Sequence, residues 1–307
     1  EHMCASGTVG IRYAFAFIAA GLADLVMVLG VEKLNVPTGE ETILNMGTGV
    51  DREWEAAHGL TAPPCFALAA QAHMTRYGTT EAQMAMVSVK NHNHAARNPY
   101  AHFQKGATLE QVLCSRMIST PFRLFMCSPI TDGAAAVILA SEEWARDLTD
   151  RPVWLRGTGQ ALDGFMLSSL HADYAHWPAM KRAAEHAYHT AEVEAADVDV
   201  AEVHDCFAIA EIIAYEELGF CAKGEGGAFV ETGLSDYGGN VVVNPRGGLI
   251  GCGHPLGATG IAQAAEIFWQ LRGEAGARQV PEATIGLTHN NSGMGEHVVV
   301  IYGREAA

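Results

Sequence analysis

A cysteine stands directly before an apolar, helix-forming stretch near the N-terminal end of the chain. Cys4 is followed by Ala-Ser-Gly and a run of small and apolar residues that predicts a helix over 5–20. A thiol at a helix N-terminus is placed where the helix dipole and the unpaired N–H groups favour the thiolate, the form that a covalent nucleophile needs. The alternative is a small buried cysteine with a packing role only.

A glycine-rich segment carries a single histidine. Residues 251–260 read Gly-Cys-Gly-His-Pro-Leu-Gly-Ala-Thr-Gly and precede an apolar helical pattern. Such a tight loop can hold the imidazole of His254 rigidly beside a nucleophile, although a plain structural turn is the alternative. A dinucleotide-binding loop is excluded because Leu256 stands where G-x-G-x-x-G requires glycine, and because no βαβ unit begins there.

A third group of reactive side chains lies where an apolar strand gives way to a helix. His204 and Cys206 are two residues apart, so in an extended segment both face one side. The carboxyl ends of strands are where α/β sheets gather site residues. His204, Cys206, Cys252 and His254 could instead bind zinc, but their spacing is unusual for that metal and we predict no metal site.

The segment 289–295, His-Asn-Asn-Ser-Gly-Met-Gly, follows another predicted strand. Its glycines could turn backbone N–H groups toward an oxyanion. The polar and aromatic stretch 91–103 is more simply read as a capped loop that packs on the core.

The elements that position these residues alternate along the chain, which favours a mixed, mostly parallel α/β fold. The continuous apolar run 25–30 predicts a strand that is covered on both faces. Residues 37–119 are richer in His, Met, Asn and Pro and have the character of an insertion. Besides 5–20, helices are predicted at 80–90, 178–193, 207–218 and 260–271, and strands at 25–30, 132–139, 153–157, 198–203, 284–288 and 298–302.

Composition limits the classes of protein to consider. The 307 residues are 49% hydrophobic and 18% charged, with a formal net charge of −16, so a packed core is expected and nucleic-acid binding is not. Seven scattered cysteines indicate reduced thiols and a cytoplasmic location. The most apolar stretch, 11–34, is interrupted by Arg12, Asp24 and Gly30, so no membrane span is predicted. The 33 glycines suggest close approaches of the backbone.

Taken together, these segments resemble the thiolase superfamily, and most closely the sterol-carrier-protein-type 3-ketoacyl-CoA thiolases. The sequence His204-Asp-Cys-Phe207 is the variant found in that subfamily in place of Asn-Glu-Ala-Phe. The most specific match is 244–260, which includes Gly-His-Pro-Leu-Gly-Ala-Thr-Gly. The other matching segments are Cys4-Ala-Ser-Gly, Gly30-Val-Glu32, Lys90 to Tyr100 and Cys127 to Ala136, so the resemblance runs over essentially the whole chain.

The resemblance implies an α/β thiolase-like fold of two similar halves, each with a five-stranded sheet, stacked in five layers with an inserted loop domain. The first half would comprise 1–36 and 120–150, the loop domain 37–119 and the second half 151–307. In the family several tens of residues precede the nucleophile, and here only three do. The first half is therefore expected to lack its N-terminal strands.

The resemblance also assigns roles. Cys4 would be the nucleophile that becomes acylated, His254 the base that activates it, and Cys206 the second acid/base. His204 would help to hold the thioester oxygen, and backbone N–H groups near Cys4 and at 293–295 would form the other oxyanion site. Coenzyme A contacts are expected at Gly293, Gly295 and Asn290.

The implied activity is thiolytic cleavage of a 3-ketoacyl-CoA to acetyl-CoA and a shortened acyl-CoA, or the reverse condensation. Coenzyme A is then a co-substrate, no cofactor is tightly bound, and a homodimer or homotetramer is expected. One departure from the family is the last loop, which lacks the usual Cys-x-Gly. His289 stands near that place, and Asn291-Ser292 replaces smaller residues, which puts the acyl pocket in doubt.

Two rival functions remain. A thiolase-like retro-aldolase would act on sterol side-chain CoA esters with an OB-fold partner protein, but such relatives typically lack the nucleophilic cysteine. A non-catalytic acyl-CoA-binding protein would not need Cys4, Cys206 and His254 together.

Overall fold

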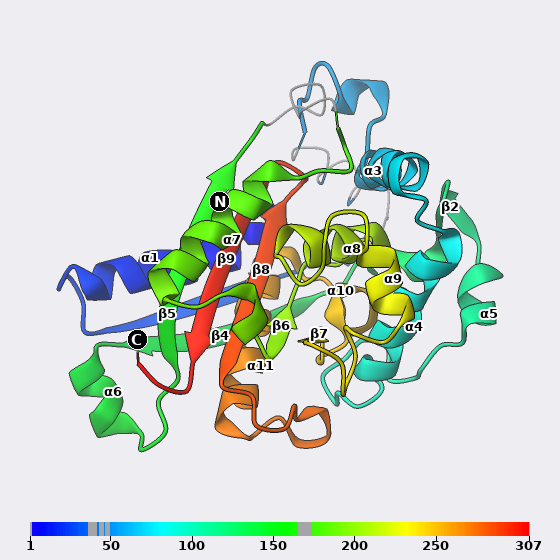
Figure 1. Cartoon of the computed structure of the whole chain (residues 1–307). Coiled ribbons are helices and arrows are strands. Elements are labelled where there is room, and N and C mark those ends of the chain that lie inside the picture. The colour runs from blue at the N-terminus through cyan, green and yellow to red at the C-terminus, as the bar shows by residue number, and fades with distance from the viewer. Residues whose placement is uncertain (1, 36–41, 43–45, 47–49, 165–172, 307) are drawn as a thin grey trace.

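The computed structural model describes residues 2–35, 42, 46, 50–164 and 173–306, and its centre is a five-stranded sheet (Figure 1). The strand order is β5 (Trp154–Leu162), β9 (Glu296–Gly303), β8 (Ile285–Ser292), β6 (Val200–Glu202) and β7 (Val242–Val243). The pairs β5–β9 and β9–β8 are antiparallel, and β6 is parallel to both β8 and β7. The prediction of mostly parallel pairing is therefore wrong, because β8 and β9 form a tight hairpin that imposes antiparallel pairing.

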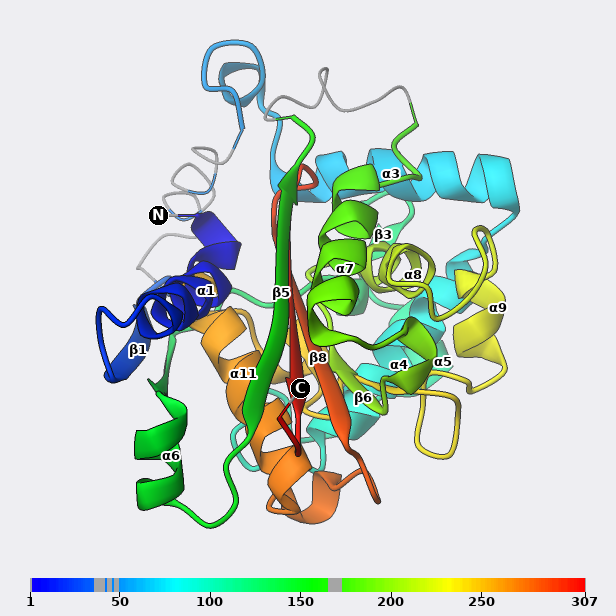
Figure 2. The same cartoon turned by 60° about the vertical axis from the view of Figure 1, so that its left-hand side comes forward.

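Helices cover both faces of this sheet. Helix α7 (Pro178–Ala191) packs on β5 and β9 from one side, while α11 (Leu256–Arg272) and α1 (Ser6–Ala19) lie on the other, as Figure 2 shows. Alanines four residues apart in α7, such as Ala179, Ala183 and Ala187, are fully buried. These helices confirm the predictions at 5–20, 178–193 and 260–271 to within a few residues.

The two strands before and after the insertion form a separate antiparallel pair. Strand β1 (Leu25–Glu32) pairs along its whole length with β4 (Gly133–Ala140). Helices α1 and α11 cover one face, but on the other face Met27 is 62% and Leu29 58% exposed. The prediction that both faces are covered is thus wrong: among the described residues nothing packs on the outer face. The first half contributes two strands here, not the five that the resemblance implies.

The insertion is mainly helical and packs beside the second half. It contains α3 (Ala62–Tyr77), α4 (Glu81–Ala95) and α5 (Leu109–Leu113), followed by the hairpin of β2 (Met117–Ser119) and β3 (Phe122–Arg123). A capping box of Thr80 and Gln83 starts α4, which confirms the helix predicted at 80–90. Helices α3 and α4 pack on α8 (Ala208–Glu217) around one large apolar core. The division into three domains stays a prediction. The remaining short helices are α6 (Glu142–Leu148), α9 (Gly226–Glu231) and α10 (Gly248–Cys252).

Glycine lets α1 and α11 approach each other closely. A Cβ at Gly260 would lie 2.7 Å from the backbone nitrogen of Thr8, a separation that real side chains do not adopt. The carboxylate of Glu32 in β1 also accepts a hydrogen bond from the Gly257 N–H at 2.8 Å, in the first turn of α11. The close approach at Gly260 holds the start of α1, which follows Cys4, against α11, which follows His254, and the Glu32 bond holds β1 against the same end of α11.

Candidate active site

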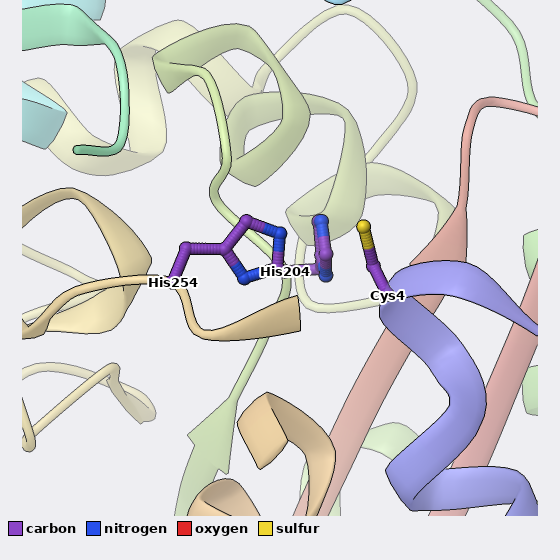
Figure 3. A group of neighbouring side chains, drawn as sticks. All are labelled: Cys4, His204 and His254. Carbon is purple, nitrogen blue, oxygen red and sulfur yellow. The ribbon is translucent and has the colours of Figure 1, made fainter. Parts of the chain in front are cut away.

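Three of the predicted site residues, Cys4, His204 and His254, meet in one cluster. Cys4 lies in a 3-10 turn (Met3–Ala5) that leads into α1, and its side chain is half-buried. Figure 3 shows Cys4, His204 and His254 in a row, with His204 in the middle. The Cys4 Sγ and one ring nitrogen of each histidine all lie within 4.8 Å of one another. The two imidazole rings are 5.0 Å apart between centroids and nearly perpendicular, at 88°.

His204 is held by a chain of hydrogen bonds that fixes its tautomer. The chain ends at the backbone carbonyl of His289, which can only accept and takes its bond from Gln263 Nε2 at 3.3 Å. The Gln263 Oε1 therefore accepts from Asn290 Nδ2 at 2.8 Å, and the Asn290 Oδ1 accepts from His204 Nδ1 at 3.0 Å. Hence the His204 proton resides on Nδ1 and its Nε2 carries a lone pair. Burial lowers the pKa of His204 to about 3, so the ring is neutral at pH 7.

His254 is fixed in the same way. Its Nδ1 lies 2.8 Å from the hydroxyl of Thr259, and that hydroxyl donates to the Pro255 carbonyl at 3.1 Å. The hydroxyl must therefore accept from His254 Nδ1–H, which leaves a lone pair on Nε2. Burial lowers the pKa of His254 well below its ordinary value. Both imidazoles are thus neutral bases with Nε2 as the available atom.

The predicted ten-residue loop around His254 is much shorter in the structure. Helix α10 (Gly248–Cys252) takes up its first part and α11 begins at Leu256, so only Gly253, His254 and Pro255 separate the two helices. Gly253 has φ of 110°, a left-handed conformation that only glycine adopts without strain. The loop prediction was wrong because the glycines of this segment serve helix packing as well as turns.

Cys206 is buried below the cluster and keeps its proton. Burial, and then the neighbouring charge of Cys4, raise the pKa of the Cys206 thiol well above its ordinary value. The protonated Cys206 thiol can act as an acid.

The segment 127–131 connects the loop that carries His204 with the loop that carries His254. Ser128 N donates to the Cys206 carbonyl at 2.9 Å, and the hydroxyl of Thr131 accepts from His254 N at 2.8 Å.

Asp205, between the two reactive residues of its loop, was missed as a functional residue. It is fully buried and accepts hydrogen bonds from Leu249 N at 2.6 Å, from Ile250 N at 3.2 Å and from Asn91 Nδ2 at 2.7 Å. Burial and the charge of Glu211 raise the pKa of Asp205 to about 7. Asp205 therefore joins the loop that carries His204 to α10. The preference of aspartate for the N-terminal ends of helices is the sequence signal that could have indicated this role.

The segment 289–295 differs from its prediction. Strand β8 runs through to Ser292, so residues 289–292 belong to the hairpin and not to a loop. Gly293 lies in the turn with φ of 59°. The turn lies close to the N-terminus, where His2 Nδ1 and Glu296 Oε1 are 2.9 Å apart. The contacts of Gly293 and Gly295 with coenzyme A stay predictions, while the buried amide of Asn290 is engaged by His204 and Gln263.

The alternative zinc set from the sequence is not assembled. Among the described residues, the cluster of potential metal ligands contains Cys4 in place of Cys206 and Cys252. The Cys252 Sγ instead accepts hydrogen bonds from Arg246 at 3.2 Å and from Asn98 at 3.5 Å. His289 is also engaged, because its Nε2 lies 3.1 Å from His297 Nδ1.

Comparison with known proteins finds relatives along most of this chain. Residues 1–108 match the family model for the thiolase N-terminal domain, and residues 159–304 match that for a thiolase C-terminal domain-like segment. An acetyl-CoA acetyltransferase of Methanothermobacter thermautotrophicus is 48% identical over 96% of this chain and 76% of its own length. The chain belongs to the thiolase superfamily. The present chain is also 41% identical to sterol carrier protein 2 of Bos taurus, and the match covers 97% of the present chain and 57% of that protein.

Two solved structures are similar to this thiolase-superfamily chain in fold. The Ltp2-ChsH2(DUF35) aldolase superposes with a TM-score of 0.86 at 27% identity, over 98% of this chain and 78% of that one. Human mitochondrial 3-ketoacyl-CoA thiolase superposes with a TM-score of 0.72 at 18% identity, over 98% of this chain and 77% of that one. At this identity the similarity shows the fold alone. The α/β thiolase-like fold is thereby confirmed, whereas its arrangement as two similar halves in five layers stays a prediction. No helix in the described part of the chain is long and apolar enough to span a bilayer.

Proposed function

We propose that this thiolase-family acyltransferase cleaves a 3-ketoacyl-CoA with coenzyme A, or catalyses the reverse condensation, through an acyl-Cys4 intermediate. The observation that carries the proposal is the cluster of Cys4 Sγ and two imidazole nitrogens within 4.8 Å of one another. One soft nucleophile beside two neutral bases is what acyl transfer between thioesters requires. The similarity to sterol carrier protein 2 supports the sterol-carrier-protein-type subfamily.

In the first step His254 Nε2 takes the proton of the Cys4 thiol, and the thiolate attacks the 3-keto carbon of the substrate. The bond between C2 and C3 then breaks. The acyl group stays on Cys4 as a thioester, and the electron pair leaves on acetyl-CoA as its enolate. The hydrogen bond between His254 Nδ1 and the Thr259 hydroxyl supports this role because it leaves the lone pair on Nε2.

Cys206 completes the cleavage by protonating C2 of the enolate. Its raised pKa keeps the thiol protonated at pH 7, as an acid must be. In the second step, the Cys206 thiolate takes the thiol proton of coenzyme A, and the coenzyme A thiolate attacks the acyl-Cys4 thioester. This attack releases the shortened acyl-CoA, and the departing Cys4 sulfur regains from His254 the proton that it lost in the first step. A thioester exchanges for a thioester, so the step is nearly neutral in energy.

The role proposed for His204 requires a refinement. Holding the thioester oxygen by donation needs a proton on Nε2, whereas Asn290 places the resting proton on Nδ1. His204 can therefore donate to the oxygen only after Nε2 gains a proton, and the Cys4 proton is not that source because His254 takes it in the first step. A donated bond to a developing oxyanion contributes about 3–4 kcal/mol.

The remaining parts of the proposal follow from the family. Coenzyme A enters as a co-substrate with no tightly bound cofactor, near Gly293 and Gly295, and the insertion at 37–119 covers it. A homodimer or homotetramer in the cytoplasm is the assembly and location that we propose.

The test is thiolysis of a 3-ketoacyl-CoA by the native chain and two variants. Cys4→Ala is expected to abolish the reaction, while Cys114→Ala is expected to leave it unchanged, because Cys114 is an exposed cysteine at the end of α5. Full activity in Cys4→Ala would contradict the proposal.

A second candidate function is retro-aldol cleavage, favoured by the TM-score of 0.86 to the Ltp2-ChsH2(DUF35) aldolase. This reaction would require an OB-fold partner protein. Product analysis separates the two, because thiolysis consumes free coenzyme A and aldol cleavage does not. Cys4 in the cluster favours thiolysis.

A further inference from the structure

The cluster of Cys4, His204 and His254 has the ligand chemistry of a metal centre. We propose that it binds one Zn²⁺ ion, or a similar borderline-soft divalent cation, through Cys4 Sγ and the Nε2 atoms of His204 and His254, and that this ion blocks acyl transfer. The sequence alone predicted no metal here, because Cys4 is 200 residues away from His204 along the chain.

The donor set argues for zinc. Thiolate and imidazole are both good ligands for Zn²⁺, whereas Mg²⁺ and Ca²⁺ prefer oxygen. Three protein ligands leave the fourth tetrahedral position for water or an incoming thiol, as in catalytic zinc sites. The cluster is therefore an open site and not a closed structural one.

The hydrogen bonds behind the ligands argue for a built site. A metal-binding histidine uses one ring nitrogen for the ion and donates the other N–H to a protein acceptor, which fixes its tautomer. Both histidines already meet this condition, since His204 Nδ1 bonds Asn290 and His254 Nδ1 bonds Thr259. Each acceptor leads on to a backbone carbonyl, so neither ring can turn over without breaking its chain.

The distances require only a local adjustment. With Zn–S near 2.3 Å and Zn–N near 2.0–2.1 Å, tetrahedral ligands lie about 3.4–3.6 Å from one another. The Cys4 Sγ and one nitrogen of each ring lie within 4.8 Å of one another, so no pair must close by more than about 1.4 Å. Rotation of the half-buried Cys4 side chain changes the two sulfur–nitrogen distances, and any closing of the nitrogen–nitrogen distance requires a small shift of one ring within its hydrogen bonds.

An ion in this position would stop catalysis. The ion would bind the Cys4 thiolate, which attacks the substrate, and the lone pair of His254, which removes the proton of the Cys4 thiol. Inhibition, unlike binding, rests on the proposed thiolase function.

The experiment uses Co²⁺ as a spectroscopic substitute for Zn²⁺. Native protein is expected to bind one Co²⁺ with a thiolate-to-cobalt charge-transfer band and the intense visible bands of a tetrahedral site. The charge-transfer band should vanish in Cys4→Ala and persist in Cys114→Ala. Thr259→Val, which removes only the acceptor behind His254, should weaken Co²⁺ binding about tenfold.

Alkylation provides the same test without a possible folding defect. Iodoacetamide treatment of folded Cys114→Ala protein should remove the band. A native protein without the band, or a band that survives in Cys4→Ala or after alkylation, would overturn the proposal.

Activity separates this proposal from the proposed function. Added Zn²⁺ should inhibit thiolysis and EDTA should restore it. A cobalt band in a protein without thiolysis would support the metal site while refuting the function, and thiolysis without the band would do the reverse.

Discussion

The hydroxyl of Thr259 decides which nitrogen of His254 can act as a base, so its removal should impair catalysis in a chain that still folds. Thr259→Val keeps the shape of the side chain and deletes the acceptor that lies 2.8 Å from His254 Nδ1. The buried Nδ1–H then lacks a partner, which costs about 1–3 kcal/mol. The ring can avoid this cost by moving its proton to Nε2, and in that tautomer it cannot deprotonate Cys4.

The expected loss in kcat/KM follows from that energy. At 1.36 kcal/mol for each factor of ten, 1–3 kcal/mol corresponds to a decrease of about 5- to 150-fold. Thiolysis of acetoacetyl-CoA, followed by the loss of its absorbance, measures this decrease directly. The free energy of unfolding should fall by about 1–3 kcal/mol, the cost of leaving this buried ring nitrogen without its partner.

Thr8→Val is the matched control for this experiment. Thr8 is also fully buried, lies on α1 close to the cluster, and its hydroxyl has no hydrogen-bond partner among the described residues. The same chemical change should therefore leave kcat/KM within about twofold and stability nearly unchanged. If Thr259→Val retained as much activity as Thr8→Val, the assignment of the His254 tautomer would be refuted.

Three further predictions concern stability. Gly260→Ala should lower the free energy of unfolding, measured by urea denaturation, by about 1–3 kcal/mol, because the new Cβ would push Thr8 and α1 away from α11. The same displacement should lower activity. An unchanged urea midpoint would refute the packing argument. Asp205→Asn should lower the free energy of unfolding by about 1.5–3 kcal/mol, because the new NH₂ group would face backbone N–H groups from which the carboxylate now accepts hydrogen bonds. A variant as stable as the native protein would show that these hydrogen bonds do not hold the loop. The free energy of unfolding should also fall as pH drops from about 6.5 to about 4, since buried neutral histidines gain protons on unfolding, and a flat profile would contradict this. The histidines whose pKa burial lowers are His92, His94, His204, His254, His289 and His297. They outnumber the two carboxyl groups that act in the opposite direction, Glu202 and Asp205, each with its pKa raised to about 7.

Local patterns in the sequence were sufficient to predict the reactive residues and, among the described helices of ten residues or more, all except α3. The apolar run after Cys4 and the small-residue face of 178–193 follow helical spacing, and both segments are helical. The run 25–30 was misjudged because continuous apolar residues do not reveal whether a second layer covers the strand. Its outer face is exposed in the described structure.

Contacts between distant segments could not be predicted. Asn290 lies 86 residues from His204, and Asp205 lies 44 residues from Leu249. Thr259 is only five residues from His254, but threonine has many other uses in a helix, so its role as an acceptor could not be predicted either. Only the fold shows that these side chains fix two imidazole tautomers and one loop.

The most direct measurement of the central claim is mass spectrometry of the protein after brief incubation with acetyl-CoA and an acid quench. The account predicts one acetyl group per chain, carried on the peptide that contains Cys4, and its loss when free coenzyme A is added before the quench. Absence of the acetyl group, or its location on Cys206 instead of Cys4, would contradict the account.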